Sequence, residues 1–292
     1  MNGQEWLAEK FEANRSHLRA VAYRMLGSVN EADDAVQETW LRLSRSDTRD
    51  VENLTGWLTT VVARVCLDLL RSRKSRREEA LDAEVTDLAT SGQTQDPEHE
   101  ALLADSVGLA LLVVLDTLTP AERLAFVLHD TFAVSFDEIG QIVGRTPAAA
   151  RQLASRARRR IQGVTSVPSE DLRRQREIID AFLTALRAGD FEGLLAVLDP
   201  DVVVHADPGA GRPGTPAEIR GARNWAQGAV TFSRMASFLE PALVNGSVGL
   251  IFAPRGRLLR VLSFRIDGGK IVEAEIIAKP ERLQQLDLGL VE

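Results

Sequence analysis

The stretch TPAAARQLASRARRRI, residues Thr146 to Ile161, decides how the rest of the chain is interpreted. At the helical period its apolar residues share one face: Ala150, Leu153, Ala154, Ala157 and Ile161. Thr146 followed by Pro147 is typical of a helix start, because the hydroxyl caps the first turn and proline already has a helical φ. The opposite face carries polar and basic residues: Arg151, Gln152, Ser155, Arg156, Arg158 and Arg159. This pattern indicates either a solvated surface or a helix that binds phosphates and base edges of a nucleic acid.

The residues before this helix favour the second interpretation. Ser135-Phe-Asp-Glu138 is a capping-box pattern that opens a short helix over Phe136–Val143, and Gly144 supplies the left-handed residue that ends it. A helix, a glycine turn and a basic amphipathic helix predict a helix-turn-helix, with the second helix in the major groove of DNA. Thr119-Pro-Ala-Glu122 is a second capping box and opens the helix upstream.

Composition excludes several classes of protein. The chain has 292 residues, a net charge of −7 and a single cysteine, Cys66, so a disulfide framework and a cysteine-rich zinc site are excluded. The four histidines, His17, His99, His129 and His205, have no metal-ligand spacing, and we expect no metal and no cofactor. The N-terminus does not resemble a signal peptide, and no apolar run approaches the roughly 18 residues that span a bilayer. A cytoplasmic protein without membrane contact is therefore expected.

Two further helices carry surfaces of opposite charge. Ser28-Val-Asn-Glu31, a third capping-box pattern, opens the segment EADDAVQETWLRL. One side of this helix is acidic and consists of Asp33, Asp34, Gln37, Glu38 and Leu41. This side is either exposed to solvent or docked on a basic protein surface. The helix over about residues 56–74 has a polar face that continues into a basic run, and Trp57 lies at the edge of this face. The face and the run together contain Thr60, Arg64, Arg71, Arg73 and Lys74. Charge beside an aromatic ring suits single-stranded nucleic acid, although Trp57 fits a core position equally well.

In chain order, these segments resemble conserved regions 2 and 4 of bacterial RNA polymerase sigma factors, of the small extracytoplasmic-function group. The resemblance implies that core RNA polymerase, through its β′ and β subunits, and promoter DNA are the partners. It implies that the acidic surface binds the β′ clamp helices. It assigns the −10 element to Trp57, Thr60, Arg64, Arg71, Arg73 and Lys74. It assigns the −35 element to Arg145, Thr146, Arg151, Gln152, Ser155, Arg156, Arg158 and Arg159.

From residue 164 onward the pattern changes to α+β. Helices are predicted from Ser169 to Gly189, from Asp190 to Leu198 and over Ile219–Met235, with a strand at Val202–His205. Two runs rich in β-formers follow, each interrupted by an Asn-Gly or Asp-Gly pair that predicts a hairpin. These elements predict a curved sheet wrapped over helices.

Residues 172–287 resemble the SnoaL-like branch of the nuclear-transport-factor-2-like cone fold. In sigma factors that carry it, this domain implies a built-in regulator, so a separate anti-sigma factor is an optional partner. The cone fold has a cavity, and its candidate lining residues are His205, Asp207 and Trp225. His205 and Asp207 are also a candidate acid–base pair, and the alternatives are a core histidine and a loop-starting aspartate. We expect no enzymatic activity.

The predicted architecture is thus multidomain. It consists of an all-α region 2 over residues 1–78, an acidic linker over 79–104, an all-α helix-turn-helix region 4 over 105–163, a linker over 164–171 and the α+β SnoaL-like domain over 172–287. The predicted function is that of a sigma factor with an intramolecular regulator. Two hypotheses compete with it: a ligand-sensing DNA-binding regulator independent of core polymerase, and a SnoaL-like enzyme fused to a DNA-binding part.

Overall fold

The computed structural model describes residues 3–46, 51, 53–80, 108–163, 167–210 and 216–291. These residues form two compact units. The first holds the described residues up to 80 together with Leu118–Arg158, and the second holds Gly108–Thr117 together with the residues from Arg159 onward. The predicted linker over 79–104 lies almost wholly outside the described residues. No helix in the described part is long and apolar enough to cross a membrane.

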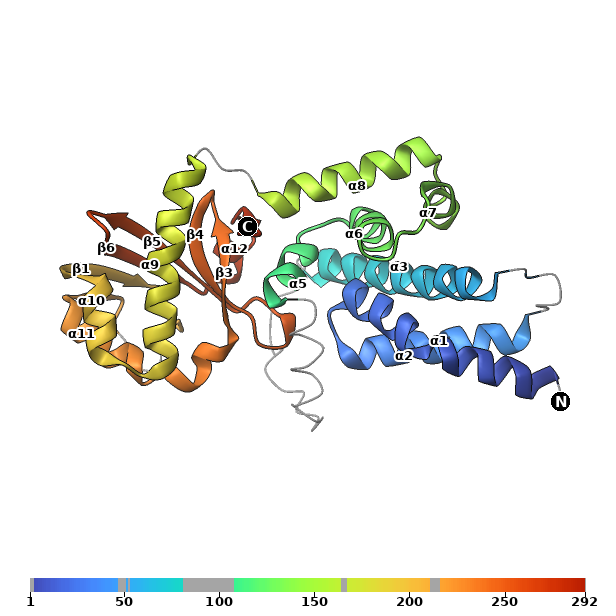
Figure 1. Ribbon diagram of the computed structural model, residues 1–292, viewed down its shortest axis with the longest axis horizontal. Coiled ribbons are helices and arrows are strands. Elements are labelled where there is room, and N and C mark those ends of the chain that lie inside the picture. Colours follow the sequence, from blue (N-terminus) through green and yellow to red (C-terminus); the bar gives the residue numbers. More distant parts are fainter. Residues whose placement is uncertain are drawn as a thin grey trace. The chain divides into compact units, whose positions relative to one another are not determined.

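Three long helices begin the first unit: α1 (Gly3–Leu26), α2 (Val29–Arg45) and α3 (Leu54–Ala80) (Figure 1). All three pack against one another, and their shared core includes Phe11, Leu18, Met25, Leu43 and Leu58. The sequence places the apolar residues of α2 on one face, and the structure confirms it, because Ala32, Ala35, Val36, Thr39 and Leu43 are all buried.

The predicted capping box at the start of α2 is wrong. Ser28 is the N-cap residue, but its side chain accepts no capping hydrogen bond. The carboxylate of Glu31 forms an ion pair with Arg73 of α3 instead of reaching back to Ser28. An ion pair between α2 and α3 thus replaces the capping contact within α2.

The helix-turn-helix follows the sequence closely. α6 (Pro120–Phe126) continues into one turn of π-helix, η1 (Val127–Thr131), and is followed by α7 (Phe136–Val143) and α8 (Pro147–Gln162). The capping boxes at Thr119 and Ser135 are both formed, and Gly144 ends α7 with a φ of 69°. Gly140 allows the turn to close, since a Cβ there would lie 2.8 Å from the carbonyl oxygen of Arg145.

α6 is tied to the three-helix part of its unit. The buried Arg123 of α6 donates from Nε to the carbonyl oxygen of Arg24 in α1, at 3.1 Å. The ring of Phe132, after η1, lies against His17 and under the guanidinium of Arg24.

The second unit is a seven-stranded mixed sheet with helices against it (Figure 1). Its helices are α9 (Ser169–Ala188), α10 (Phe191–Val197), α11 (Ala222–Val230), the 3-10 turns η2 (Ser233–Phe238) and η3 (Pro254–Gly256), and the short α12 (Pro280–Leu283). Its strands are β1 (Leu198–Ala206), β2 (Glu218–Arg220), β3 (Leu239–Val244), β4 (Ser247–Phe252), β5 (Arg260–Asp267), β6 (Lys270–Ile277) and β7 (Leu288–Gly289). The strand order is β2-β1-β6-β5-β4-β3-β7, and only β1 and β6 are parallel among these described neighbours.

The predicted α+β domain and both hairpins are confirmed, with two local corrections. The predicted helix over Ile219–Met235 is wrong at its start, because Ile219 lies in β2 and pairs with Val204 of β1. Gly221, with a φ of 86°, separates that strand from α11. In the second hairpin Asp267 pairs with Lys270, so the turn consists of Gly268 and Gly269 and not of an Asp-Gly pair.

Compactness assigns two short pieces to the second unit. α5 (Leu109–Asp116) packs against β3 and η3, and Leu112, Val113, Val114 and Leu115 are buried. The residues of α8 from Arg159 onward also belong to this unit. The predicted domain boundaries, which place both pieces in one helix-turn-helix domain over 105–163, stay predictions.

Candidate functional site

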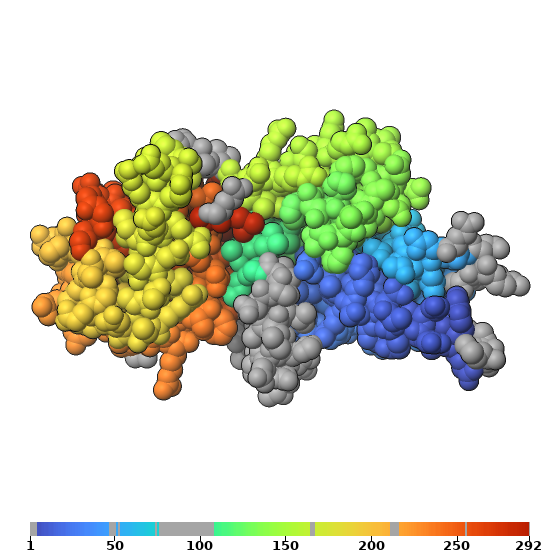
Figure 2. All heavy atoms as spheres, viewed as in Figure 1, coloured from blue at the N-terminus to red at the C-terminus, as the bar shows by residue number. Residues whose placement is uncertain are grey.

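The polar face of α8 is accessible in the structure. Its apolar face is buried as the sequence indicates, and Arg151, Gln152, Arg156 and Arg159 are exposed, with Ser155 and Arg158 half-buried. Thr146 caps the helix by accepting a hydrogen bond from the backbone N–H of Ala149, at 3.2 Å. In Figure 2 the long side chains of α8, in yellow-green, project from the surface.

Three arginines of this face are held by neighbours in the first unit. The guanidinium of Arg151 lies 5.2 Å from the ring centroid of Phe136. Arg156 donates from Nε to Glu122 at 3.0 Å, and Arg158 donates from Nε to Asp130 at 2.6 Å. Because both bonds use Nε, the outer nitrogens of these two arginines remain available to a ligand.

Two predicted DNA-binding sets meet in one groove of about 560 Å³ in the first unit. Arg71, assigned to the −10 set, lines it together with Arg145 and Arg156, assigned to the −35 set. Glu122 also lies there and both caps α6 and binds Arg156. The sequence alone does not indicate that these side chains share a groove.

The other members of the −10 set have different surroundings. Arg64 is exposed, while Trp57 and Thr60 are half-buried. Arg73 donates to the carbonyl oxygen of Leu26 and forms an ion pair with Glu31, so it holds α3 against α1 and α2. The side chain of Lys74 lies outside the described part.

The acidic side of α2 is a surface. Asp33, Asp34 and Gln37 are exposed, and Glu38 is half-buried and bound to Arg42. Asp33 forms an ion pair with Arg19 of α1 at 2.7 Å. Leu41, at the C-terminal end of this side, is 39% exposed and places an apolar side chain beside the acidic ones.

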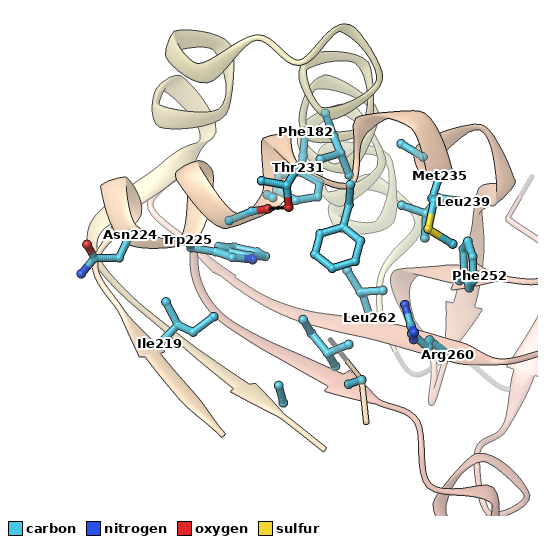
Figure 3. Close-up of a pocket in the computed structure, with 18 of the residues that line it drawn as sticks. Phe182, Ile219, Asn224, Trp225, Thr231, Met235, Leu239, Phe252, Arg260 and Leu262 are labelled. Carbon is cyan, nitrogen blue, oxygen red and sulfur yellow. Dashed lines mark hydrogen bonds between the residues drawn. The ribbon is translucent and has the colours of Figure 1, made fainter. Parts of the chain in front are cut away.

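A cavity of about 520 Å³ lies in the second unit, between α9, α11 and η2 and one face of the sheet (Figure 3). Of the three candidate lining residues, Trp225 does line it. The prediction is wrong for His205 and Asp207. Side chains alternate along a strand, so Ala206 faces the cavity while His205 points to the other face of β1, near Glu218 and Glu273.

Asp207 has a structural role instead of the acid–base role considered above. Its carboxylate accepts hydrogen bonds from the backbone N–H groups of Ala278 and Lys279 and from Arg282, at 3.0, 3.2 and 2.8 Å. Burial raises the pKa of Asp207, but these donors outweigh burial and the pKa is lowered overall. Asp207 therefore anchors the segment after β6.

The end of α8 is joined to the sheet of the second unit. The backbone N–H of Leu290, after β7, donates to the carbonyl oxygen of Ile161 at 2.7 Å. The backbones of Gly163 and Gly289 lie in close contact. A Cβ on Gly289 would be only 2.7 Å from the Cα of Gly163, so the junction leaves no room for a side chain there. No sequence motif signals this junction.

No group of three or more metal-binding side chains occurs in the part of the chain that the structure describes. His17 bonds to Thr59, and His129 bonds to the carbonyl oxygen of Val134 and stacks on Phe136. Burial raises the pKa of the Cys66 thiol to about 12, so this cysteine is a core residue and not a nucleophile.

Comparison with protein families matches residues 11–76 to Sigma-70 region 2 and residues 108–161 to Sigma-70 region 4. A Mycobacterium tuberculosis protein, the probable ECF RNA polymerase sigma factor SigI, is 34% identical over 290 residues, which cover 98% of this chain and 98% of that protein. The ECF RNA polymerase sigma factor SigJ of the same organism is 36% identical over 287 residues, covering 94% of this chain and 92% of that protein.

Among solved structures, the crystal structure of M. tuberculosis extracytoplasmic function sigma factor SigJ matches with a TM-score of 0.45 and 32% sequence identity. The match covers 94% of this chain and 98% of that chain.

Proposed function

The chain belongs to the extracytoplasmic-function sigma factors of bacterial RNA polymerase. We propose which of its described residues contact the promoter, which bind the polymerase and which regulate promoter recognition. A sigma factor binds core RNA polymerase, directs it to specific promoters and initiates transcription. Core polymerase and promoter DNA are therefore partners of this chain. Promoter recognition is a binding function, and the proposal assigns no catalysed reaction to the chain.

α8 reads the −35 element through Arg145, Thr146, Arg151, Gln152, Ser155, Arg156, Arg158 and Arg159. The observation that carries this assignment is the helix's buried apolar stripe with an exposed face free of carboxylates. Arg151 and Arg156 are held by Phe136 and Glu122, which reduces the side-chain entropy lost when they bind DNA. Such an arrangement favours specific base contacts over loose phosphate binding.

α3 contributes the −10 contacts. Arg64 and Arg71 are exposed and suit the phosphates of the opened strand, and Trp57 suits an unstacked base. Arg73 acts mainly in holding α3 to its neighbours. The exposed acidic side of α2, with Leu41 at its C-terminal end, docks on the polymerase β′ subunit.

The second unit regulates promoter recognition through the helices of region 4. The region 4 match spans residues 108–161, yet α5 and the last turn of α8 cluster with the sheet of the second unit. Leu290 and Gly289 are bonded to and packed on the end of α8. We therefore expect a change at β7 to act on α8 through this junction.

Run-off transcription with purified core polymerase tests both the sigma-factor function and its regulation by the second unit. The full-length chain should co-migrate with core enzyme on a sizing column and start transcription, and failure would overturn the sigma-factor assignment. DNA opening without core polymerase would instead favour the independent ligand-sensing regulator.

Testing regulation by the second unit requires a variant that leaves both units folded. Gly289→Val places a side chain against Gly163 and should separate the end of α8 from β7, changing transcript yield relative to the wild type. Ser263→Val, on β5 of the same sheet, is the matched control and should leave yield unchanged. Equal yield from the Gly289 variant and the wild type would refute coupling at this junction. Deletion of residues 170–292 should also alter yield.

A further inference from the structure

The cavity of the second unit has the size and surface of a ligand site. Its volume of about 520 Å³ falls within the roughly 300–1,000 Å³ of small-molecule pockets. Phe182 and Trp225 form an aromatic wall, with ring centroids 5.3 Å apart and an angle of 30° between the ring planes. Ile219 and Leu262 approach from the sheet (Figure 3). Flat, apolar surfaces of this kind suit a ring system.

The guanidinium of Arg260 lies among these apolar side chains. Arg260 lines the cavity with Leu262, two residues along β5, and its guanidinium lies 5.4 Å from the ring centroid of Phe252. In the described part of the chain the side chain of Arg260 has this ring contact and neither a hydrogen bond nor an ion pair. Burial lowers the pKa of Arg260, which reflects its partial loss of water.

The other charged lining residues neutralise each other. Arg220 donates from Nε to Glu218 at 2.6 Å, and both belong to β2. Arg260 therefore contributes a positive charge that no described carboxylate balances. A half-buried cation without a partner is costly, and an anionic ligand would remove that cost.

A glycine keeps the cavity open. Gly228 lies within α11, where glycine costs about 0.5–1 kcal/mol relative to alanine. A Cβ built at this position would meet no atom within 4 Å, and Gly228 lines the cavity. Packing does not require glycine here, so its presence preserves space at a cost to the helix.

The rim beside Arg260 is apolar and accessible. Met235 lines the cavity and is 43% exposed. Phe238 and Leu259, also among the exposed large apolar side chains, adjoin Phe252 through a ring contact and a backbone hydrogen bond. Exposed apolar residues gathered at a cavity are typical of a ligand's path.

We propose that this cavity binds an apolar ring compound with a single anionic group, such as an aromatic carboxylate. Its rings lie against Phe182 and Trp225, and its anion pairs with Arg260. A neutral ligand would leave the charge of Arg260 unbalanced, and a strongly hydrated polyanion would not desolvate in so apolar a site. Binding at this site does not depend on the regulatory role proposed above.

Titration calorimetry on the full-length chain tests the proposal with matched pairs of probes. The probes are 2-naphthoate and anthracene-9-carboxylate, each compared with its own primary amide. The acids should bind more tightly than the amides by about tenfold or more, the ratio to which 1.4 kcal/mol corresponds. No binding by either acid at millimolar concentration, or equal affinity of acid and amide, would overturn the proposal.

Three variants localise the effect. Arg260→Met keeps an apolar side chain and should abolish the preference for the acid. Arg265→Met, which removes an exposed arginine of the same strand, should retain that preference. Gly228→Leu should fill the cavity and weaken binding of acid and amide alike. Circular dichroism melts establish that each variant is folded, and an unchanged preference in folded Arg260→Met would contradict the assigned anion site.

Discussion

Replacing Arg156 by alanine should weaken binding to the −35 element in a sequence-dependent way. The side chain of Arg156 is 53% exposed, and Glu122 holds only its Nε. Its two outer nitrogens match the paired acceptors on the major-groove edge of guanine. One such contact is worth about 1–3 kcal/mol, so we expect affinity for the best promoter to fall by about 5-fold to 150-fold.

The assay is fluorescence anisotropy of the complex with core polymerase on promoter fragments selected by the wild-type holoenzyme from a random library. Each base of the −35 element is then substituted in turn. Arg156→Ala should remove discrimination at one base pair and leave it intact at the others. Arg156→Lys should not restore it, because lysine cannot replace a bidentate contact while also bonding Glu122.

Arg174→Ala, on the exposed surface of α9, is the matched control and should leave binding unchanged. An equal loss on every sequence would show that Arg156 contacts a phosphate. Unaltered affinity in a folded Arg156→Ala chain would refute the assignment of this side chain to the −35 element.

Three more predictions concern the other surfaces. Leu41→Asp should weaken binding to core polymerase by about tenfold or more, since burying a leucine contributes about 1.5–3 kcal/mol, and co-migration on a sizing column measures it. Asp207→Asn should lower the free energy of unfolding of the second unit by about 1–3 kcal/mol at pH 7, read from hydrogen exchange of β6 amides. Because the folded pKa of Asp207 is lowered, its contribution is complete above the unfolded pKa of about 3.9 and disappears as the pH falls through the folded pKa, so the difference between wild type and variant should shrink in acid. Thr146→Ala should speed amide exchange in the first turn of α8, corresponding to about 0.5–2 kcal/mol of lost capping.

Local signals predicted most of the helices and hairpins because their causes are local. A hydroxyl and a carboxylate three residues apart form the capping boxes at Thr119 and Ser135. The same pattern failed at Ser28, where Arg73, far along the chain, binds Glu31. Ile219 similarly lies in a strand because β1 is available to pair with it.

The site was predictable in its exposed faces and not in its internal geometry. Helical periodicity separates the buried and exposed sides of α8, but it cannot place Arg71 and Arg156 in one groove. Their proximity in the sequence indicated His205 and Asp207 as a candidate acid–base pair. The contacts of Asp207, however, depend on how the chain folds after β6. Arg260 was missed, although its place beside Leu262 and Phe264 in a strand of alternating side chains was a usable signal.

β3 connects the two features proposed for the second unit. Its first residue, Leu239, lines the cavity, and Leu243 pairs with Gly289 of β7, which packs against Gly163 just after α8. Four residues of strand span only about 13 Å, so one rigid element reaches from the cavity to the junction.

A ligand can act on α8 through β3 only if it binds one arrangement of the junction better than another. Coupling of binding free energies is reciprocal, so promoter DNA must then change the affinity of the cavity by the same factor as the ligand changes affinity for DNA. Equal ligand affinity with and without promoter DNA in the holoenzyme would place the cavity outside promoter control, whatever it binds.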